Sequence, residues 1–432
     1  GHFGKSSRAQ PRAAGGEFSG RTIGCAGCFL LHESGVQRIR STICPRLHGP
    51  PDLWEEEVLQ GGSAGGQYGV FAEPELLSPV PQRVDGASIA EVLHGSWRVA
   101  PPPVTVSSET LETLNARLQA TGTGGLAWSR IRHSDLAETE AGASLHDAYR
   151  VHTLDALRHD ERLKGALHVL ETAGVQPVLA KGWSVARSYP SRGLRPFGDH
   201  DLFVAPVEFL AAETALAAYQ GESLMVDLHM GVPAGRGDWA SVQARTHEVE
   251  LGERAVRVFA PEDQLGLLGP HLLFHGAWRP LWLCDIADLV ESLSGDFDWD
   301  YLCSRPKRQV DEVRVVVRLA HEVLGADIGR TPWADSNHRL PAWLPKATLA
   351  AWSDEHYSTT TSIMLTEARV RTVLRSLRLR WPNPIEVTHR WGMPYNALSR
   401  LPLQLWDATV RTARAVGGAP ARLGGRKRLS ES

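Results

Sequence analysis

Residues 178–204 read VLAKGWSVARSYPSRGLRPFGDHDLFV, and this stretch decides the fold. A short apolar run leads into Lys181-Gly182, and a second apolar run begins at Asp199-His200-Asp201. Side chains alternate between the two faces of a strand, so Asp199 and Asp201 should share a face that His200 avoids. Two carboxylates on one face form half of a divalent-cation site.

The flanking residues predict helices and strands in alternation. A helix is expected from Ser144 to Leu170, followed by Gly174 as a stop, because leucines recur near helical spacing at Leu154, Leu157, Leu163, Leu167 and Leu170. Short strands are expected over 175–180 and 199–204, with a short helix over 184–189 between them and another opened by Pro206. A strand over 224–230 would carry Asp227 and His229 on one face.

These elements predict an α+β fold, with a small mixed β-sheet core, packed helices, and α-helical N-terminal and C-terminal regions. Residues 1–75 lack apolar periodicity and are expected to form a disordered leader. The further boundaries that we expect are a helical N-terminal region over 76–170, the sheet-bearing core over 171–260, a helical domain over 261–345, a basic helical region over 346–420 and a flexible tail over 421–432.

Composition narrows the class of protein. The 432 residues carry a formal charge of -3, which gives no global attraction to nucleic acid or anionic membranes. No run of about 18 apolar residues and no signal-peptide pattern occur, so we expect a cytoplasmic protein without membrane partners. Five cysteines are too few for a disulfide scaffold in a chain of this length.

Two clusters outside the core each admit two interpretations. Cys25, Cys28, Cys44 and His48 have an order that could hold zinc, or they are a chance cluster in a flexible leader. The arginines of residues 369–380, together with Arg426-Lys427-Arg428, form either a solvated face or a surface for nucleic acid or phosphate.

The acids of the core suit phosphate chemistry. Moving a phosphoryl or nucleotidyl group requires neutralised phosphates and an aligned attacking hydroxyl, which two divalent ions supply. Asp199 and Asp201 would hold the metal on the nucleotide side, and Asp227 would help bind the second metal and orient or deprotonate the nucleophile. The turn Lys181-Gly182-Trp183-Ser184 would present an ammonium, backbone N–H groups and a hydroxyl to a triphosphate.

In its motifs the chain resembles the uncharacterised nucleotidyltransferase family of the DNA polymerase β-like nucleotidyltransferase superfamily. The residues that carry the resemblance span roughly 80 to 345, and they are Leu179-Ala-Lys181-Gly182, Arg195-Pro-Phe-Gly-Asp199-His-Asp201-Leu202, Val226-Asp227-Leu228-His229, Pro261-Glu-Asp263, His275-Gly276 and Asp285-Ile-Ala287. Three positions depart from the family pattern: Ala180 interrupts a Leu-Lys-Gly triplet, Trp183 follows the glycine, and Met230 replaces an aromatic residue.

The resemblance implies that residues 171–260 form a nucleotidyltransferase core with Asp199, Asp201 and Asp227 as metal-binding acids. It also implies an NTP substrate, Mg²⁺ with Mn²⁺ as an alternative, and Lys181, Gly182 and Arg195 at the phosphates or the substrate. The acceptor would be an unidentified small molecule, protein or RNA.

Several side chains keep alternative roles at this point. His275 and Asp285 of the helical domain would either close the cleft from its far side or form a buried pair that holds helices together. His229 would either contact a phosphate or move a proton, or it would brace Asp227 by a hydrogen bond. Arg195 would either clamp a phosphate or pair with one of the clustered acids.

Two other classes of function compete with the transferase. A metal-dependent phosphohydrolase would use His200-Asp201 as a metal-binding dyad, which requires a helix at these positions. A non-catalytic binding or regulatory protein would keep the nucleotidyltransferase fold without needing the carboxylates.

Overall fold

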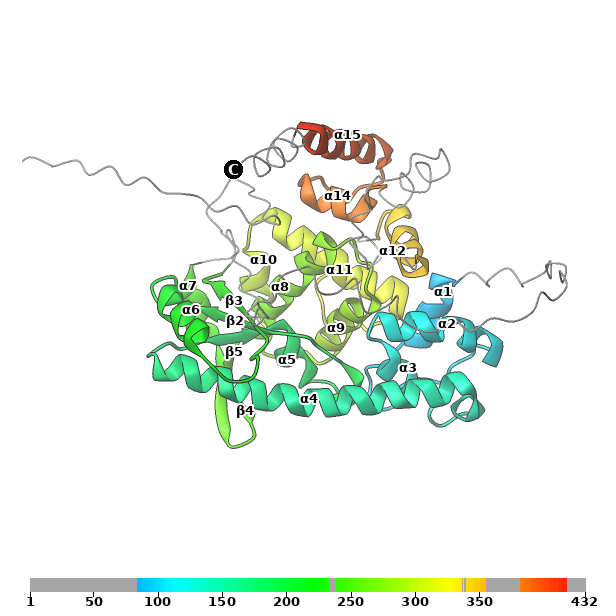
Figure 1. Ribbon diagram of the computed structural model, residues 1–432. Helices are drawn as coiled ribbons and strands as arrows, with labels where there is room; N and C mark the ends of the chain where they lie inside the picture. Colours follow the sequence, from blue (N-terminus) through cyan, green and yellow to red (C-terminus); the bar gives the residue numbers. More distant parts are fainter. Residues whose placement is uncertain (1–83, 233–237, 336, 338, 355–380, 418–432) are drawn as a thin grey trace, which may run out of the picture. The chain divides into compact units, whose positions relative to one another are not determined.

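Helices surround a five-stranded sheet in the computed structural model, which describes residues 84–232, 238–335, 337, 339–354 and 381–417 (Figure 1). All of these residues belong to one unit, Arg38–Ser432. The expected leader and tail, the candidate zinc ligands and both arginine clusters lie outside the described residues. The predicted α+β class is confirmed.

The sheet is mixed, and its pairing brings distant parts of the chain to one edge. Its strands are β1 (Val178–Ala180), β2 (His200–Val204), β3 (Val226–Met230), β4 (His247–Leu251) and β5 (Arg254–Val258), in the order β3-β2-β1-β5-β4. Strand β2 runs antiparallel to β1 and parallel to β3. The end of β1 therefore meets the beginnings of β2 and β3.

One face of the sheet is covered by two helices, α4 (Glu140–Thr172) and α6 (Phe209–Ala218). Alternate residues of the strands, such as Leu202 and Leu228, pack there against Leu167 of α4. Each fully buried leucine stabilises the fold by about 1.5–3 kcal/mol. The opposite face carries Phe203 in a separate apolar cluster, so β2 alternates as the sequence predicts.

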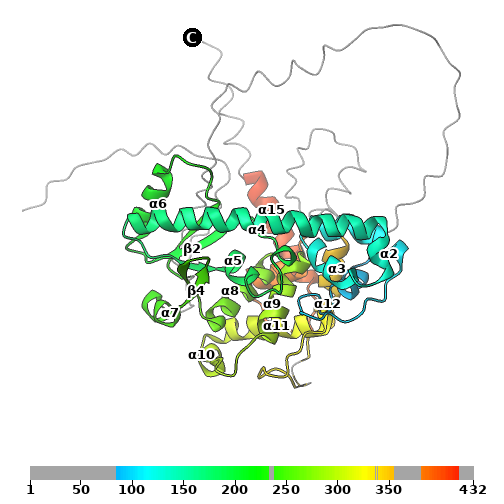
Figure 2. The ribbon, with the colours of Figure 1, turned by 90° about the horizontal axis from the view of Figure 1, so that it is seen from below.

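The long helix α4 begins earlier than predicted. Its N-cap is Thr139, whose hydroxyl accepts a hydrogen bond from the Gly142 amide at 3.0 Å, so Ser144 lies inside the helix. Figures 1 and 2 both show α4 running from the sheet to the helices α2 (Ser108–Ala120) and α3 (Gly124–Ile131), which it contacts. Helix α4 thus packs against both the strands of the sheet and the N-terminal helices.

A second and larger apolar core contains Trp97, Leu145, Leu272 and Val316. The remaining helices are α1 (Gly86–Leu93), η1 (Asp135–Glu138), α5 (Lys181–Ala186), η2 (Arg192–Leu194), α7 (Trp239–Arg245), α8 (Pro261–Phe274), α9 (Pro280–Glu291), α10 (Trp299–Cys303), α11 (Lys307–Leu324), α12 (Trp343–Ser353), α14 (Pro384–Arg390) and α15 (Leu401–Gly417). Among the helices described, none has the length and apolar character to cross a membrane.

Candidate active site

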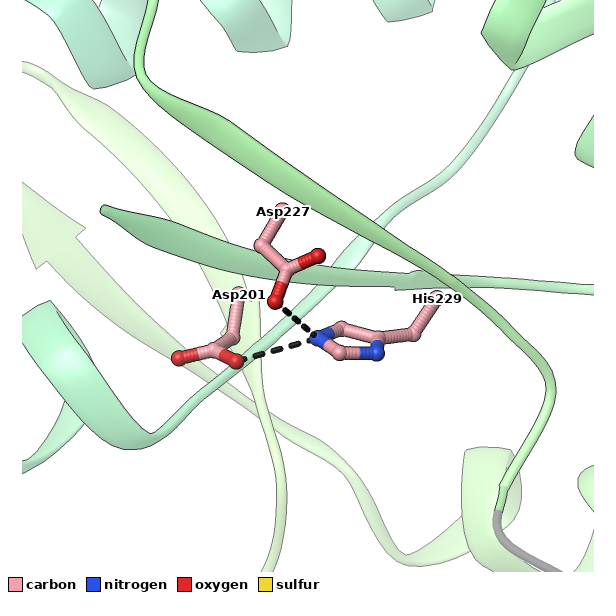
Figure 3. A group of neighbouring side chains, drawn as sticks. All are labelled: Asp201, Asp227 and His229. Carbon is pink, nitrogen blue, oxygen red and sulfur yellow. Dashed lines mark hydrogen bonds and ion pairs between the residues drawn. The ribbon is translucent and has the colours of Figure 1, made fainter. Parts of the chain in front are cut away.

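Two aspartates from neighbouring strands meet at the edge where β1 ends. The parallel register of β2 and β3 sets Asp201 opposite Asp227, and His229 follows on the same face of β3. Ligand atoms of these three residues lie within 4.8 Å of one another. Figure 3 shows His229 Nε2 between the two carboxylates, 3.0 Å from Asp201 Oδ1 and 3.4 Å from Asp227 Oδ2.

The end of β1 delivers a cation to this pair of acids. Ala180 lies opposite Asp201 in the antiparallel register, and the Lys181 Nζ that follows is 2.6 Å from Asp201 Oδ1. Lys181 has a φ of 44°, a left-handed backbone that non-glycine residues adopt rarely. The chain thus turns sharply at the point where its ammonium faces the acids.

Gly182 is required by a close backbone approach. A Cβ atom at this position would lie 2.9 Å from the carbonyl oxygen of Asp199. The next residue, Trp183, anchors the turn from behind, because its indole Nε1 donates a hydrogen bond to Asp160 of α4 at 2.8 Å. The predicted turn and the predicted acidic stretch therefore touch each other directly.

Burial and hydrogen bonding shift the pKa values of the two acids in opposite directions. Burial disfavours the ionised form of Asp201, but the hydrogen bond to His229 and the Lys181 ammonium outweigh it and hold the pKa of Asp201 well below its ordinary value. Burial also disfavours the ionised form of Asp227, but the hydrogen bond to His229 outweighs burial and lowers the pKa of Asp227. Burial alone would lower the pKa of His229, whereas its bonds to both carboxylates raise it.

Asp199 stands apart from the three clustered residues. It immediately precedes β2, is exposed, and is not within the group whose ligand atoms meet. Partial desolvation, followed by the negative charges of Asp201 and Asp227, raises the pKa of Asp199. A cation near Asp199 would relieve this repulsion.

Arg195 and Ser184 do not join the acids. The buried Arg195 guanidinium binds Asp285 of α9 through two hydrogen bonds, of 3.0 Å from Nε and 2.7 Å from Nη2. The Tyr189 hydroxyl donates to the same carboxylate at 2.9 Å. Arg195 thereby ties the loop before Asp199 to α9, whereas Ser184 is buried within α5.

His200 lies on the other face of the sheet and not beside the acids. Its ring lies 5.2 Å from that of His159 on α4 and 5.9 Å from that of Phe197, measured between centroids. Burial lowers the pKa of His200 to about 3, so the ring is neutral. Residues 200–204 form a strand, so the helical His-Asp dyad required by the phosphohydrolase hypothesis does not occur.

Sequence reasoning missed Arg279 and the bonds that join Asp285 to Tyr189 and Arg195. Arg279 precedes α9 and exerts an electrostatic interaction with Asp199, although 80 positions separate them in the chain. The sequence did indicate Asp285, six residues later, as a residue of the helical domain that could close the cleft.

The clustered residues fit a divalent cation. Asp201 and Asp227 offer carboxylate oxygens, which suit Mg²⁺ or Mn²⁺. The Lys181 ammonium already places a positive charge against Asp201. His229 hydrogen-bonds to both acids, which favours its role as a brace that fixes their orientation.

Fold and site together define an α+β protein with two aspartates and a histidine clustered at one edge of a mixed sheet. The chain belongs to the family described as "Uncharacterised nucleotidyltransferase", whose model matches residues 107–325. The match runs from the N-cap of α2 to the end of α11 and includes every residue assigned from the sequence to the nucleotidyltransferase site. The resemblance seen in the sequence is confirmed. A comparison with curated proteins gave no significant match.

Proposed function

We propose that this chain transfers an NMP group from an NTP to a hydroxyl or phosphate group of an acceptor, with Mg²⁺ or Mn²⁺ required. The observation that supports this most is the register of β2 and β3, which sets Asp201 against Asp227 beside the Lys181 ammonium. Divalent ions bound there would neutralise the phosphates and hold the attacking and leaving oxygens.

In this proposal, the place of each side chain in the site determines its role. Asp199 and Asp201 hold the nucleotide side of the site, and Asp227 holds the acceptor side. Lys181 compensates negative charge at Asp201 and at the phosphates, and Gly182 allows the turn to approach Asp199. His229 fixes both acids by hydrogen bonds.

Arg195 and Ser184 support the site less directly. Because Asp285 occupies the Arg195 guanidinium, Arg195 holds the loop before Asp199 in place. Ser184 is buried in α5, the short helix that begins at Lys181. Both residues position the nucleotide-binding turn and loop.

The bond changes are those of nucleotidyl transfer. The acceptor oxygen bonds to the α-phosphorus, the bond from that phosphorus to the bridging oxygen breaks, and pyrophosphate leaves. When the acceptor is a hydroxyl, its proton passes to the Asp227 carboxylate, whose pKa is kept low by His229. We place the reaction in the cytoplasm, where NTPs are available, and the acceptor is a small molecule, a protein or an RNA.

Incubation with cell extract tests this function. Each NTP, labelled in its α-phosphate, is added with Mg²⁺ and the protein, and the label is followed into small molecules, proteins and RNA. We expect incorporation into one class, and none with the double variant Asp199→Ala/Asp201→Ala. Equal incorporation by the double variant would contradict the function and favour a non-catalytic role.

A further inference from the structure

Arg279 reaches the nucleotide side of the site from outside the sheet. It is the half-buried N-cap residue of α9, and its Nε donates a hydrogen bond to the Thr121 carbonyl at 2.9 Å. A Cβ atom on Gly122, which has a φ of 75°, would lie 2.7 Å from Arg279 Nη2 and 3.2 Å from Pro196 Cγ. The guanidinium therefore lies beside the loop that leads to Asp199, in space that Gly122 leaves open.

The charge of Arg279 has no fixed counter-ion. Its terminal nitrogens form no hydrogen bond or ion pair with the residues that the structure describes, since Asp285 is bound by Arg195. Partial burial and the neighbouring Arg195 lower the pKa of Arg279 to about 10, against the attraction of Asp285 and Asp199. A partly desolvated guanidinium without an anion is costly, and a bound anion would offset that cost.

We propose that Arg279 binds a phosphate of the NTP on the Asp199 side of the site. The planar guanidinium presents paired donors that match phosphate oxygens, and both terminal nitrogens remain available. The inference rests on the proposed function, and it gives the α8–α9 connection a direct role in holding the nucleotide. Arg195, one residue before Pro196, cannot take this role while it binds Asp285.

Calorimetry with inorganic tripolyphosphate and Mg²⁺ tests the proposal, because every NTP carries this group. Arg279→Gln should weaken binding about ten- to a hundredfold, the effect of losing charge-assisted hydrogen bonds, and Arg279→Lys should weaken it less. Arg330→Gln is the matched control, since Arg330 also donates to a backbone carbonyl, that of Leu293, beyond the other end of α9. Its affinity should equal that of the wild type.

The outcomes distinguish a failure of the proposed function from a failure of the Arg279 assignment alone. Wild-type protein that binds neither tripolyphosphate nor any NTP would overturn the proposed function, and the role of Arg279 with it. Wild-type binding that Arg279→Gln leaves unchanged would overturn the Arg279 assignment alone. If Arg279→Gln raised only the KM for a phosphorylated acceptor, the Arg279 assignment would also be overturned. Arg279 would then bind the phosphate of the acceptor and not that of the NTP. Circular dichroism checks that each variant folds. If Arg279→Gln does not fold, the comparison is made with Arg279→Lys, which keeps the positive charge.

Discussion

At the scale of single residues, the backbone of Lys181 carries local strain. A non-glycine residue in a sparsely populated conformation costs about 1–3 kcal/mol and persists only when its surroundings hold it. Here the ion pair of Lys181 with Asp201 and the hydrogen bond of Trp183 to Asp160 hold the turn from two sides. The strain lies where the ammonium meets the acids, as expected for a site built in advance of its ligand.

The close approach of Gly182 to Asp199 gives a prediction about packing. Gly182→Ala should lower the free energy of unfolding by about 1–3 kcal/mol, because the added methyl would press on the Asp199 carbonyl. Urea titration measures this. Gly198→Ala, next to Asp199 in the loop before β2, is the control, because a Cβ there meets nothing within 4 Å. Equal stability of the two variants would contradict the close approach.

The bracing role of His229 predicts a graded loss of metal affinity. His229→Ala should weaken Mn²⁺ binding about ten- to a hundredfold, as is typical when a residue that orients ligands is removed. His229→Gln should recover part of the loss, because its amide nitrogen can replace Nε2 between the carboxylates. Electron paramagnetic resonance follows free Mn²⁺. His247→Ala, at an exposed position on β4, should bind as the wild type does; a matching loss there would argue against a specific brace.

At the scale of elements, alternation along strands made part of the site predictable. Asp201 and His200 point to opposite faces, and Asp227 shares its face with His229, as the period of two requires. The order of the strands was not predictable, because pairing between β1 and β2 depends on contacts distant in sequence. The pairing of Lys181 with Asp201 follows from that register and so appeared only in the structure.

Helix α9 gives a prediction about pH. Burial raises the pKa of Asp288 from 3.8 to about 7, and its contact in the structure is a 2.5 Å hydrogen bond from the Ser188 hydroxyl. Folding thus favours the neutral carboxyl. Its contribution to stability is fully present below the unfolded pKa near 4 and is lost as the pH rises through about 7.

Asp288→Asn should remove this dependence, because asparagine stays neutral. Relative to the wild type, its free energy of unfolding should rise by about 2–3 kcal/mol between pH 5 and pH 8.5. Denaturant titrations at both values measure it. Asp147→Asn, an exposed position on α4, should follow the wild-type curve. Parallel curves for Asp288→Asn and the wild type would show that Asp288 is ionised throughout.

At the scale of the whole molecule, helices that the sequence assigns to separate regions share a core. Leu118 and Leu145 lie in the same apolar cluster as Leu272 and Val316. Helical periodicity predicts an apolar stripe but does not say what covers it, and Leu154 and Leu157 of α4 are in fact 59% and 48% exposed. The position of Arg279 and the bonds of Asp285 to Arg195 and Tyr189 escaped prediction for the same reason.

The fate of the α- and γ-phosphates tests the central claim, that the Asp201–Asp227 edge transfers nucleotidyl groups. The protein is incubated with extract and Mg²⁺, using an NTP labelled in either the α- or the γ-phosphate. We predict that only the α-label becomes attached to an acceptor, and that EDTA or Asp201→Asn abolishes its incorporation. Transfer of the γ-label, or release of inorganic phosphate without α-label incorporation, would contradict the claim.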